Sequence, residues 1–310
     1  MTSPLIFAKN LSKWYGEVIG LNSFNLEVNS GITGIVGPNG AGKSTFFKLI
    51  TGMIRANSGE IYVMDEDPWN NTRILQDIGF CPDYDNLPDD STGFEFLSLS
   101  GRLHGMKNEE LVERIYEVSE IVGMTKALNR KIGGYSKGMR QRIKLAGSIL
   151  HEPDVLLLDE PLSGADPEAR KSLIEVIKAL HSEKNHDIVV SSHVLFEIER
   201  MTKNVALIYK GRAIASGDIS EIRALIDEHP HNVVIKGDDI TELGKRLLDK
   251  SYTISVRFEG SREHMNIEVS KPEEFFSDIS KLVTDTRCEI TELYSLDDNL
   301  EAVFKYLIGG

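Results

Sequence analysis

The feature that most constrains this chain is a glycine-rich segment that directly follows the apolar run Ile32–Val36. The segment fits the pattern G-x-x-x-x-G-K-[ST] and consists of Gly37, Pro38, Asn39, Gly40, Ala41, Gly42, Lys43, Ser44 and Thr45. Apolar residues at helical spacing follow it, beginning with Phe46 and Phe47. A strand, a glycine-rich turn and a helix in this order form the context that a phosphate-binding loop requires. The alternative, a chance match in an ordinary strand–turn–helix, does not explain why the context fits as well.

The residue types in this loop predict how it binds a phosphate. Glycines let the backbone curl so that successive N–H groups face one anion, and the following helix adds its positive end. We expect Lys43 to reach the β- and γ-phosphates of a nucleotide and Ser44 to place its hydroxyl on Mg²⁺. The motif occurs once, so the chain holds one such site.

A second motif is an acid pair that follows the wholly apolar run Val155–Leu158. Such a run is typical of a strand buried in a parallel sheet, and ligands bind at the carboxyl ends of these strands. Two acids at this place are costly without a cation. We expect Asp159 to hold Mg²⁺, directly or through water, and Glu160 to polarise the attacking water as general base. An acid pair beside a strand is common in isolation, but the upstream phosphate loop favours the metal interpretation.

The rest of the sequence predicts two domains. Residues 5–36 have the pattern of strands and turns, and strands then alternate with helices, for example a helix over 167–181 and a strand over 188–190. Residues 92–150 are largely helical in pattern. We therefore predict an α/β nucleotide-binding domain over 1–220, with a helical subdomain at about 90–150.

The pattern changes near residue 220. Beyond it, strands and helices follow in the order β-α-β-β-α-β, which is the order of a ferredoxin-like unit. The segments are a strand near 232–236, a helix over 240–249, strands over 252–258 and 263–269, a helix over 272–284 and a strand over 288–294. A last helix is expected over 299–308. Residues 221–310 are thus predicted to form a small α+β accessory domain.

Composition excludes several classes of function. The net charge of −13 argues against a nucleic-acid partner, because phosphate contacts need Lys and Arg. No apolar run approaches the ~18 residues of a spanning helix, and the first residues lack the pattern of a signal peptide. The two cysteines are far apart and predict two buried thiols rather than a disulfide or a metal site. We expect a cytoplasmic protein that another chain carries to the membrane.

Further motifs carry a resemblance to a family. Lys13–Gly16 precedes the phosphate loop, Tyr135–Arg142 precedes the acid pair, and Ser163–Asp166 and Ser191–His193 follow it. With the motifs in this order, residues 5–220 resemble the ATP-binding subunits of ABC transporters, which are P-loop NTPases.

The resemblance implies further site residues. It implies that Tyr15 stacks on adenine and that His193 contacts the γ-phosphate. It also implies that Ser136 and Gly138 contact a γ-phosphate bound on a second subunit, and that Ser163–Asp166 crosses the interface between the two. Out of this context, Tyr15 and His193 would be interpreted as structural residues and Ser136 as a plain helix cap.

Three departures from the family pattern stand out. Asp83 occupies the place where the family usually carries a glutamine that senses Mg²⁺ and the transporter, and a carboxylate can also bind Mg²⁺. Tyr135, Lys137 and Met139 replace the commonest signature residues, and Gly164-Ala165 replaces the common Ala-Leu. We interpret these as variation within the family, because every group with direct chemistry is present.

Two segments resemble the ABC-2-type exporters, namely Thr92–Leu97 and Leu296–Phe304. This resemblance implies an ATPase that exports cargo through a separate multi-span permease on the inner face of the membrane. It also implies that two cassettes, identical or different, close head to tail on two ATP molecules. In the family a groove beside Asp83 and the helical segment near 92–125 receives a helix of the permease.

Two other functions compete with this interpretation. One is a soluble ABC ATPase that acts on ribosomes or DNA, but such relatives carry two cassettes or a long coiled-coil insertion, and residues 46–135 show no sustained heptads. The other is a regulatory subunit without catalysis, against which the intact Glu160 and His193 argue.

Overall fold

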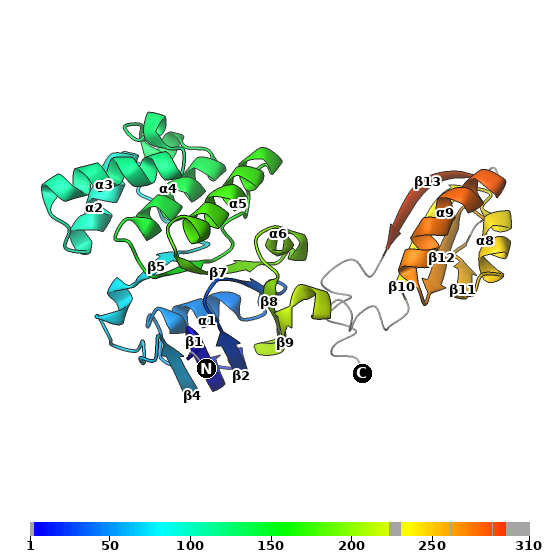
Figure 1. Cartoon of the computed structure of the whole chain (residues 1–310), viewed down its shortest axis with the longest axis horizontal. Helices are drawn as coiled ribbons and strands as arrows, with labels where there is room; N and C mark the ends of the chain where they lie inside the picture. Colours follow the sequence, from blue (N-terminus) through cyan, green and yellow to red (C-terminus); the bar gives the residue numbers. More distant parts are fainter. Residues whose placement is uncertain (1–2, 223–230, 261, 287, 296–310) are drawn as a thin grey trace. The chain divides into compact units, whose positions relative to one another are not determined.

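The computed structural model describes residues 3–222, 231–260, 262–286 and 288–295. The chain divides into two compact units, Met1–Asp218 and Ile219–Gly310 (Figure 1). The first unit carries the phosphate loop and the acid pair. No helix in the described ranges is both long and apolar enough to cross a membrane.

A six-stranded sheet forms the centre of the first unit, in the order β5-β6-β7-β3-β8-β9. These strands are β5 (Ile78–Cys81), β6 (Val155–Leu158), β7 (Asp187–Ser192), β3 (Ile32–Val36), β8 (Asn204–Tyr209) and β9 (Arg212–Asp218). All neighbours pair in parallel except β8 and β9, which are antiparallel. Every residue of β3 and β6 is buried, as expected for strands covered on both faces. The parallel register brings the carboxyl ends of β3, β6 and β7 to one edge, where the site forms.

A three-stranded antiparallel sheet in the order β2-β1-β4 completes the strand framework of this unit. It contains β1 (Ile6–Tyr15), β2 (Val18–Val28) and β4 (Ser58–Val63). The helix after the phosphate loop, α1 (Lys43–Ile50), shares one apolar core with both sheets. Its Phe46 and Phe47 are fully buried, and the Phe46 ring centre lies 4.8 Å from that of Phe24 in β2. Burial of each ring contributes about 1.5–3 kcal/mol, which anchors the loop to the core.

The predicted helical subdomain contains α2 (Gly93–Leu103), α3 (Asn108–Ile121) and α4 (Lys137–Ile149), which gather away from the antiparallel sheet (Figure 1). Thr92 and Glu95 form a capping box at the start of α2, which explains where that helix begins. Ile115 and Val118 of α3 are fully buried, because helical spacing places them on one face. Two more helices follow the acid pair, α5 (Pro167–Ser182) and α6 (Leu195–Glu199).

Within residues 231–295, the described part of the second unit contains a four-stranded antiparallel sheet, the helices α8 and α9, and its own apolar core. Its elements are β10 (His231–Asp238), α8 (Thr241–Leu248), β11 (Thr253–Phe258), β12 (His264–Val269), α9 (Pro272–Thr286) and β13 (Glu289–Ser295). The strand order β11-β12-β10-β13 is that of a ferredoxin-like unit, as predicted. The helix predicted over 299–308 lies outside the described residues. Both cysteines are free thiols, but Cys288 is only partly buried, unlike the buried Cys81.

Candidate nucleotide site

The phosphate loop joins β3 to α1 and requires glycine for two different reasons. Gly40 and Gly42 have φ angles of 79° and 114°, in the region that favours glycine. A Cβ on Gly37 would lie 2.2 Å from the carbonyl oxygen of Ile208, so no side chain fits there. The loop thus curls tightly against β8 and opens at the start of α1, where its N–H groups can face an anion.

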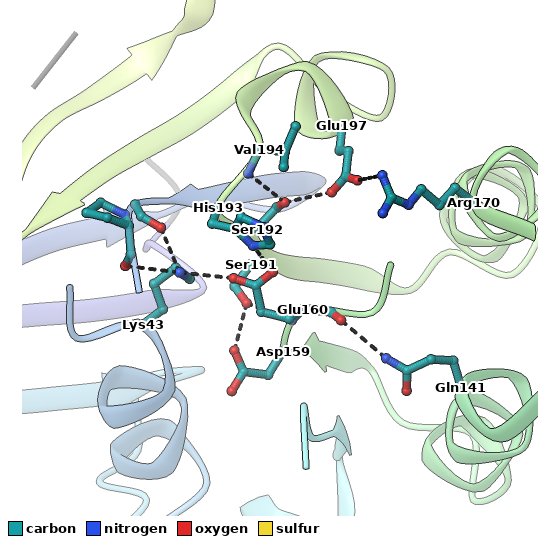
Figure 2. Close-up of polar contacts among 12 residues, drawn as sticks. Lys43, Gln141, Asp159, Glu160, Arg170, Ser191, Ser192, His193, Val194 and Glu197 are labelled. Atoms are coloured by element: carbon teal, nitrogen blue, oxygen red, sulfur yellow. Dashed lines mark hydrogen bonds and ion pairs between the residues drawn. The ribbon is translucent and has the colours of Figure 1, made fainter. Parts of the chain in front are cut away.

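Lys43 lies at the centre of this loop and is buried. Its Nζ donates to the carbonyl oxygens of Gly37 at 2.7 Å and Pro38 at 3.3 Å, and lies 3.0 Å from Oε1 of Glu160 (Figure 2). The lysine therefore links the phosphate loop to the acid pair. A cation held here faces the charge of any phosphate that the loop N–H groups bind.

Ser191, at the end of β7, joins the two acids. Its hydroxyl accepts the N–H of Glu160 at 2.9 Å and donates to Oδ1 of Asp159 at 2.7 Å (Figure 2). Ser191 is completely buried, and Asp159 is nearly so. Glu160 has a φ of 48°, a left-handed conformation that few residues other than glycine adopt and that often occurs at functional sites. Sequence reasoning missed Ser191, although its place directly after a buried strand was a usable signal.

His193 completes the cluster around Glu160. Its Nδ1 lies 2.8 Å from Oε2 of Glu160, while Lys43 contacts the other carboxylate oxygen. The glutamate is thus held on both sides, and it lines the pocket described below. A carboxylate fixed in this way can accept a proton from a water molecule beside a bound phosphate.

A pocket of about 380 Å³ opens in front of these groups. Of the residues that the sequence predicted, it is lined by Tyr15, Asn39, Gly40, Ala41, Gly42, Lys43, Ser44, Thr45, Asp83 and Glu160. Gly37, Pro38 and His193 do not line it but contact residues that do, and Asp159 is tied to Glu160 through the hydroxyl of Ser191. Tyr15 is 44% exposed and lines the pocket, which suits an aromatic side chain that stacks on a base.

Asp83 approaches the same acids from the end of β5. Partial burial, followed by the charges of Asp159 and Glu160, raises the pKa of its carboxyl above the usual value. Three carboxylates that repel one another at one edge of a pocket form the environment that a divalent cation relieves.

These acids and the Ser44 hydroxyl supply hard oxygen ligands, which suit Mg²⁺. In the part of the chain that the structure describes, no three acidic, histidine or cysteine side chains are grouped closely enough to hold a metal by themselves. Mg²⁺ is usually held by one or two carboxylates together with substrate phosphates. The residues therefore fit a magnesium ion that arrives with a nucleotide.

Ser136 and Gly138 are not brought to this pocket. Ser136 caps α4 by accepting the N–H of Met139 at 3.3 Å, and its side chain is exposed. The neighbouring departure from the family pattern, Tyr135, has a structural role: it is buried and donates its hydroxyl to the carbonyl of Ala127 at 2.7 Å. The signature segment thus presents an exposed helix start outside this pocket.

Helix α4 reaches back to the site through side chains that the sequence did not single out. Gln141 donates to the carbonyl oxygen of Glu160 at 3.2 Å. Arg140 and Lys144 bind the segment that follows β5, which carries Asp83. Their spacing of four residues places both cations on one helix face, but the pattern did not reveal their partner.

Comparison with known proteins agrees with this geometry. Residues 21–163 match the family described as ABC transporter. The linearmycin resistance ATP-binding protein LnrL of Bacillus subtilis is 30% identical over 98% of this chain and 98% of that protein. The bacitracin transport ATP-binding protein BcrA of Bacillus licheniformis is 28% identical over 99% and 98%. The dimeric structure of MJ0796, a bacterial ABC transporter cassette, covers 69% of this chain and 98% of its own, with 26% identity and a TM-score of 0.64. This chain therefore belongs to the ATP-binding subunits of ABC transporters and is an ATPase.

Proposed function

We propose that this chain drives export through a separate membrane permease by binding and hydrolysing ATP at the interface of two cassettes. One observation carries the hydrolytic part of the proposal: Glu160 is held between Lys43 and His193 at the mouth of the phosphate loop. The names of the relatives support the export part, since LnrL is a resistance protein and BcrA a bacitracin transport protein.

Each predicted residue has a role in this cycle. The loop N–H groups and Lys43 bind the phosphates, and Tyr15 stacks on the base. Ser44, Asp159 and Asp83 would hold Mg²⁺, which supplies neutralising charge at the phosphates when bound. Glu160 accepts the proton of the attacking water, and His193 fixes the glutamate and faces the γ-phosphate.

A second cassette supplies the remaining contacts. At the start of α4, Ser136 is exposed and Gly138 is partly exposed, and neither residue lines the pocket of its own chain. A helix start with free N–H groups suits an anion, so these residues would cover the γ-phosphate on the partner. The dimeric form of MJ0796 supports the pairing of two cassettes. ATP bound at a shared interface then favours association, because binding and dimerisation are thermodynamically linked.

A groove between β5, with the segment that follows it, and the helices α2 and α4 is the proposed docking site for the permease. Its volume is about 440 Å³, and its lining includes Ile78, Phe80, Tyr84, Leu87 and Phe96. On α2 beside it, Leu99 is 59% and Leu103 80% exposed. Apolar side chains exposed next to an apolar groove mark an interaction surface. Through this contact the chain would lie on the inner, cytoplasmic face of the membrane.

An affinity purification tests the transport part of the proposal. The tagged chain is recovered from detergent-solubilised native membranes and its partners are identified by mass spectrometry. We expect a stoichiometric multi-span protein, and its loss in Leu103→Asp. The matched control is Leu248→Asp, which alters an equally apolar side chain, 56% exposed, in the second unit and should keep the permease. Recovery with ribosomes, or without any membrane protein, would contradict the transport proposal and leave the ATPase assignment intact.

A further inference from the structure

Lys144 connects the docking groove to the nucleotide pocket. It lies on α4, and it lines the groove together with Pro82 and Tyr84. Asp83, between these two residues, lines the nucleotide pocket instead. The segment Pro82–Tyr84 therefore borders both the groove and the nucleotide pocket. The contacts that hold its backbone determine where the Asp83 carboxylate lies.

The Lys144 ammonium group fixes that backbone. Its Nζ donates to three consecutive carbonyl oxygens, those of Pro82 at 2.8 Å, Asp83 at 3.2 Å and Tyr84 at 3.3 Å. An ammonium group has three protons, so its donors match these acceptors in number. Lys144 is only 8% exposed, and a buried cation is costly unless polar groups surround it. The buried ammonium group therefore needs these three carbonyl acceptors, and the same hydrogen bonds fix the backbone of Pro82–Tyr84.

A second cation holds the far end of the same segment. Arg140, one turn earlier on α4, binds the carboxylates of Asp85 and Asp89, each at 2.6 Å. Those acids are exposed, whereas the carbonyls that Lys144 binds flank Asp83 directly. Of the two cations, Lys144 is thus the one that constrains the position of Asp83.

We propose that Lys144 is a positioning residue that holds Asp83 where its carboxylate binds the magnesium of MgATP. The inference rests on the proposed function, in which Asp83 is a magnesium ligand. It also explains how Asp83 can replace the glutamine that the family usually carries at this position. An aspartate side chain is shorter than a glutamine, so the backbone that carries it must be held in place for the carboxylate to reach the metal. Loss of a group that orients a metal ligand typically lowers metal affinity about 10–100-fold.

Equilibrium binding of a fluorescent ATP analogue to the full chain tests the proposal. Affinity is measured in excess Mg²⁺ and in EDTA, and the ratio of the two dissociation constants is the magnesium gain. We expect Lys144→Met to reduce this gain by about tenfold or more, while the dissociation constant measured in EDTA changes little. Asp83→Asn should reduce it similarly, and the double variant should lose no more than the larger single loss, because both act on one ligand.

Arg114→Met is the matched control. Arg114 is also a buried cation that donates to α4, but to the carbonyls of Ile149 and Leu150 at its far end. It should lower stability and leave the magnesium gain unchanged. If Lys144→Met does not fold, Lys144→Gln removes the charge with a smaller change in polarity and should also reduce the gain.

The outcomes separate this inference from the proposed function. A wild-type gain in a folded Lys144 variant, additive losses in the double variant, or an equal loss in Arg114→Met would overturn the role of Lys144 alone. A wild-type chain that binds the analogue without any magnesium gain would overturn the magnesium site as well. Failure of the wild type to bind the analogue would contradict the proposed function itself.

Discussion

Ser191→Ala should destabilise the cassette, because one buried hydroxyl joins both acids of the site. The substitution removes an acceptor 2.9 Å from the N–H of Glu160 and a donor 2.7 Å from Oδ1 of Asp159. An orphaned buried donor costs about 1–3 kcal/mol, and a hydrogen bond to a charged group contributes about 1.5–3 kcal/mol. Because the two losses share one site and are not additive, we expect the free energy of unfolding to fall by about 2–4 kcal/mol.

Urea-induced unfolding without nucleotide, followed by circular dichroism, measures this loss through the transition midpoint of the cassette. The matched control is Ser148→Ala. That hydroxyl is equally buried but donates only to the carbonyl of Leu145, 2.8 Å away and one turn earlier in α4. The control should lose less than about 1 kcal/mol. Equal losses in the two variants, or a Ser191→Ala midpoint at the wild-type value, would refute the reasoning.

Three further predictions follow from single contacts. Tyr135→Phe removes the bond to Ala127 and should lower the free energy of unfolding by about 1 kcal/mol while ATPase activity persists, which a parallel urea and phosphate-release assay checks. Gly42→Ala should abolish binding of a fluorescent ATP analogue, because φ is 114° and a Cβ would lie 2.7 Å from the carbonyl oxygen of Gly20; near-normal affinity would contradict this. Burial lowers the pKa of His151 from 6.5 to about 4. Between these two pH values the unfolded state binds more protons than the folded state, so the free energy of unfolding should fall as the pH drops from 6.5 towards 4. His151→Gln should reduce the difference between urea midpoints near neutral pH and at about pH 5, and an unchanged difference would exclude this histidine as a source.

The sequence predicted the elements whose signal is local. The strand and helix that flank the phosphate loop, and the buried strand before the acid pair, form where they were predicted, because residue types there dictate backbone shape and burial over a few positions. The β-α-β-β-α-β order likewise predicted the ferredoxin-like sheet, since few topologies accommodate it. Boundaries shifted slightly: the strand predicted over 188–190 extends to Asp187–Ser192.

Contacts between segments that are distant in the chain could not be predicted from the sequence. Ser191 and Glu160 are far apart in the chain and meet only because β6 and β7 pair in parallel. Lys144 had the pattern of an ordinary helix position, and its carbonyl partners follow a different strand. The left-handed conformation of Glu160 was not predictable either, because it depends on how the loop after β6 packs rather than on residue type.

Glu160→Gln in the presence of ATP tests the central claim most directly, that Glu160 is the general base for hydrolysis of ATP held between two cassettes. The variant keeps the shape of the side chain but cannot accept the proton. Size-exclusion chromatography with light scattering should find the 34.6 kDa chain as a dimer with ATP and as a monomer without it. Phosphate release should fall by about 10²–10⁴-fold, the usual contribution of a general base. Wild-type turnover in this variant, or a monomer at saturating ATP, would contradict the claim.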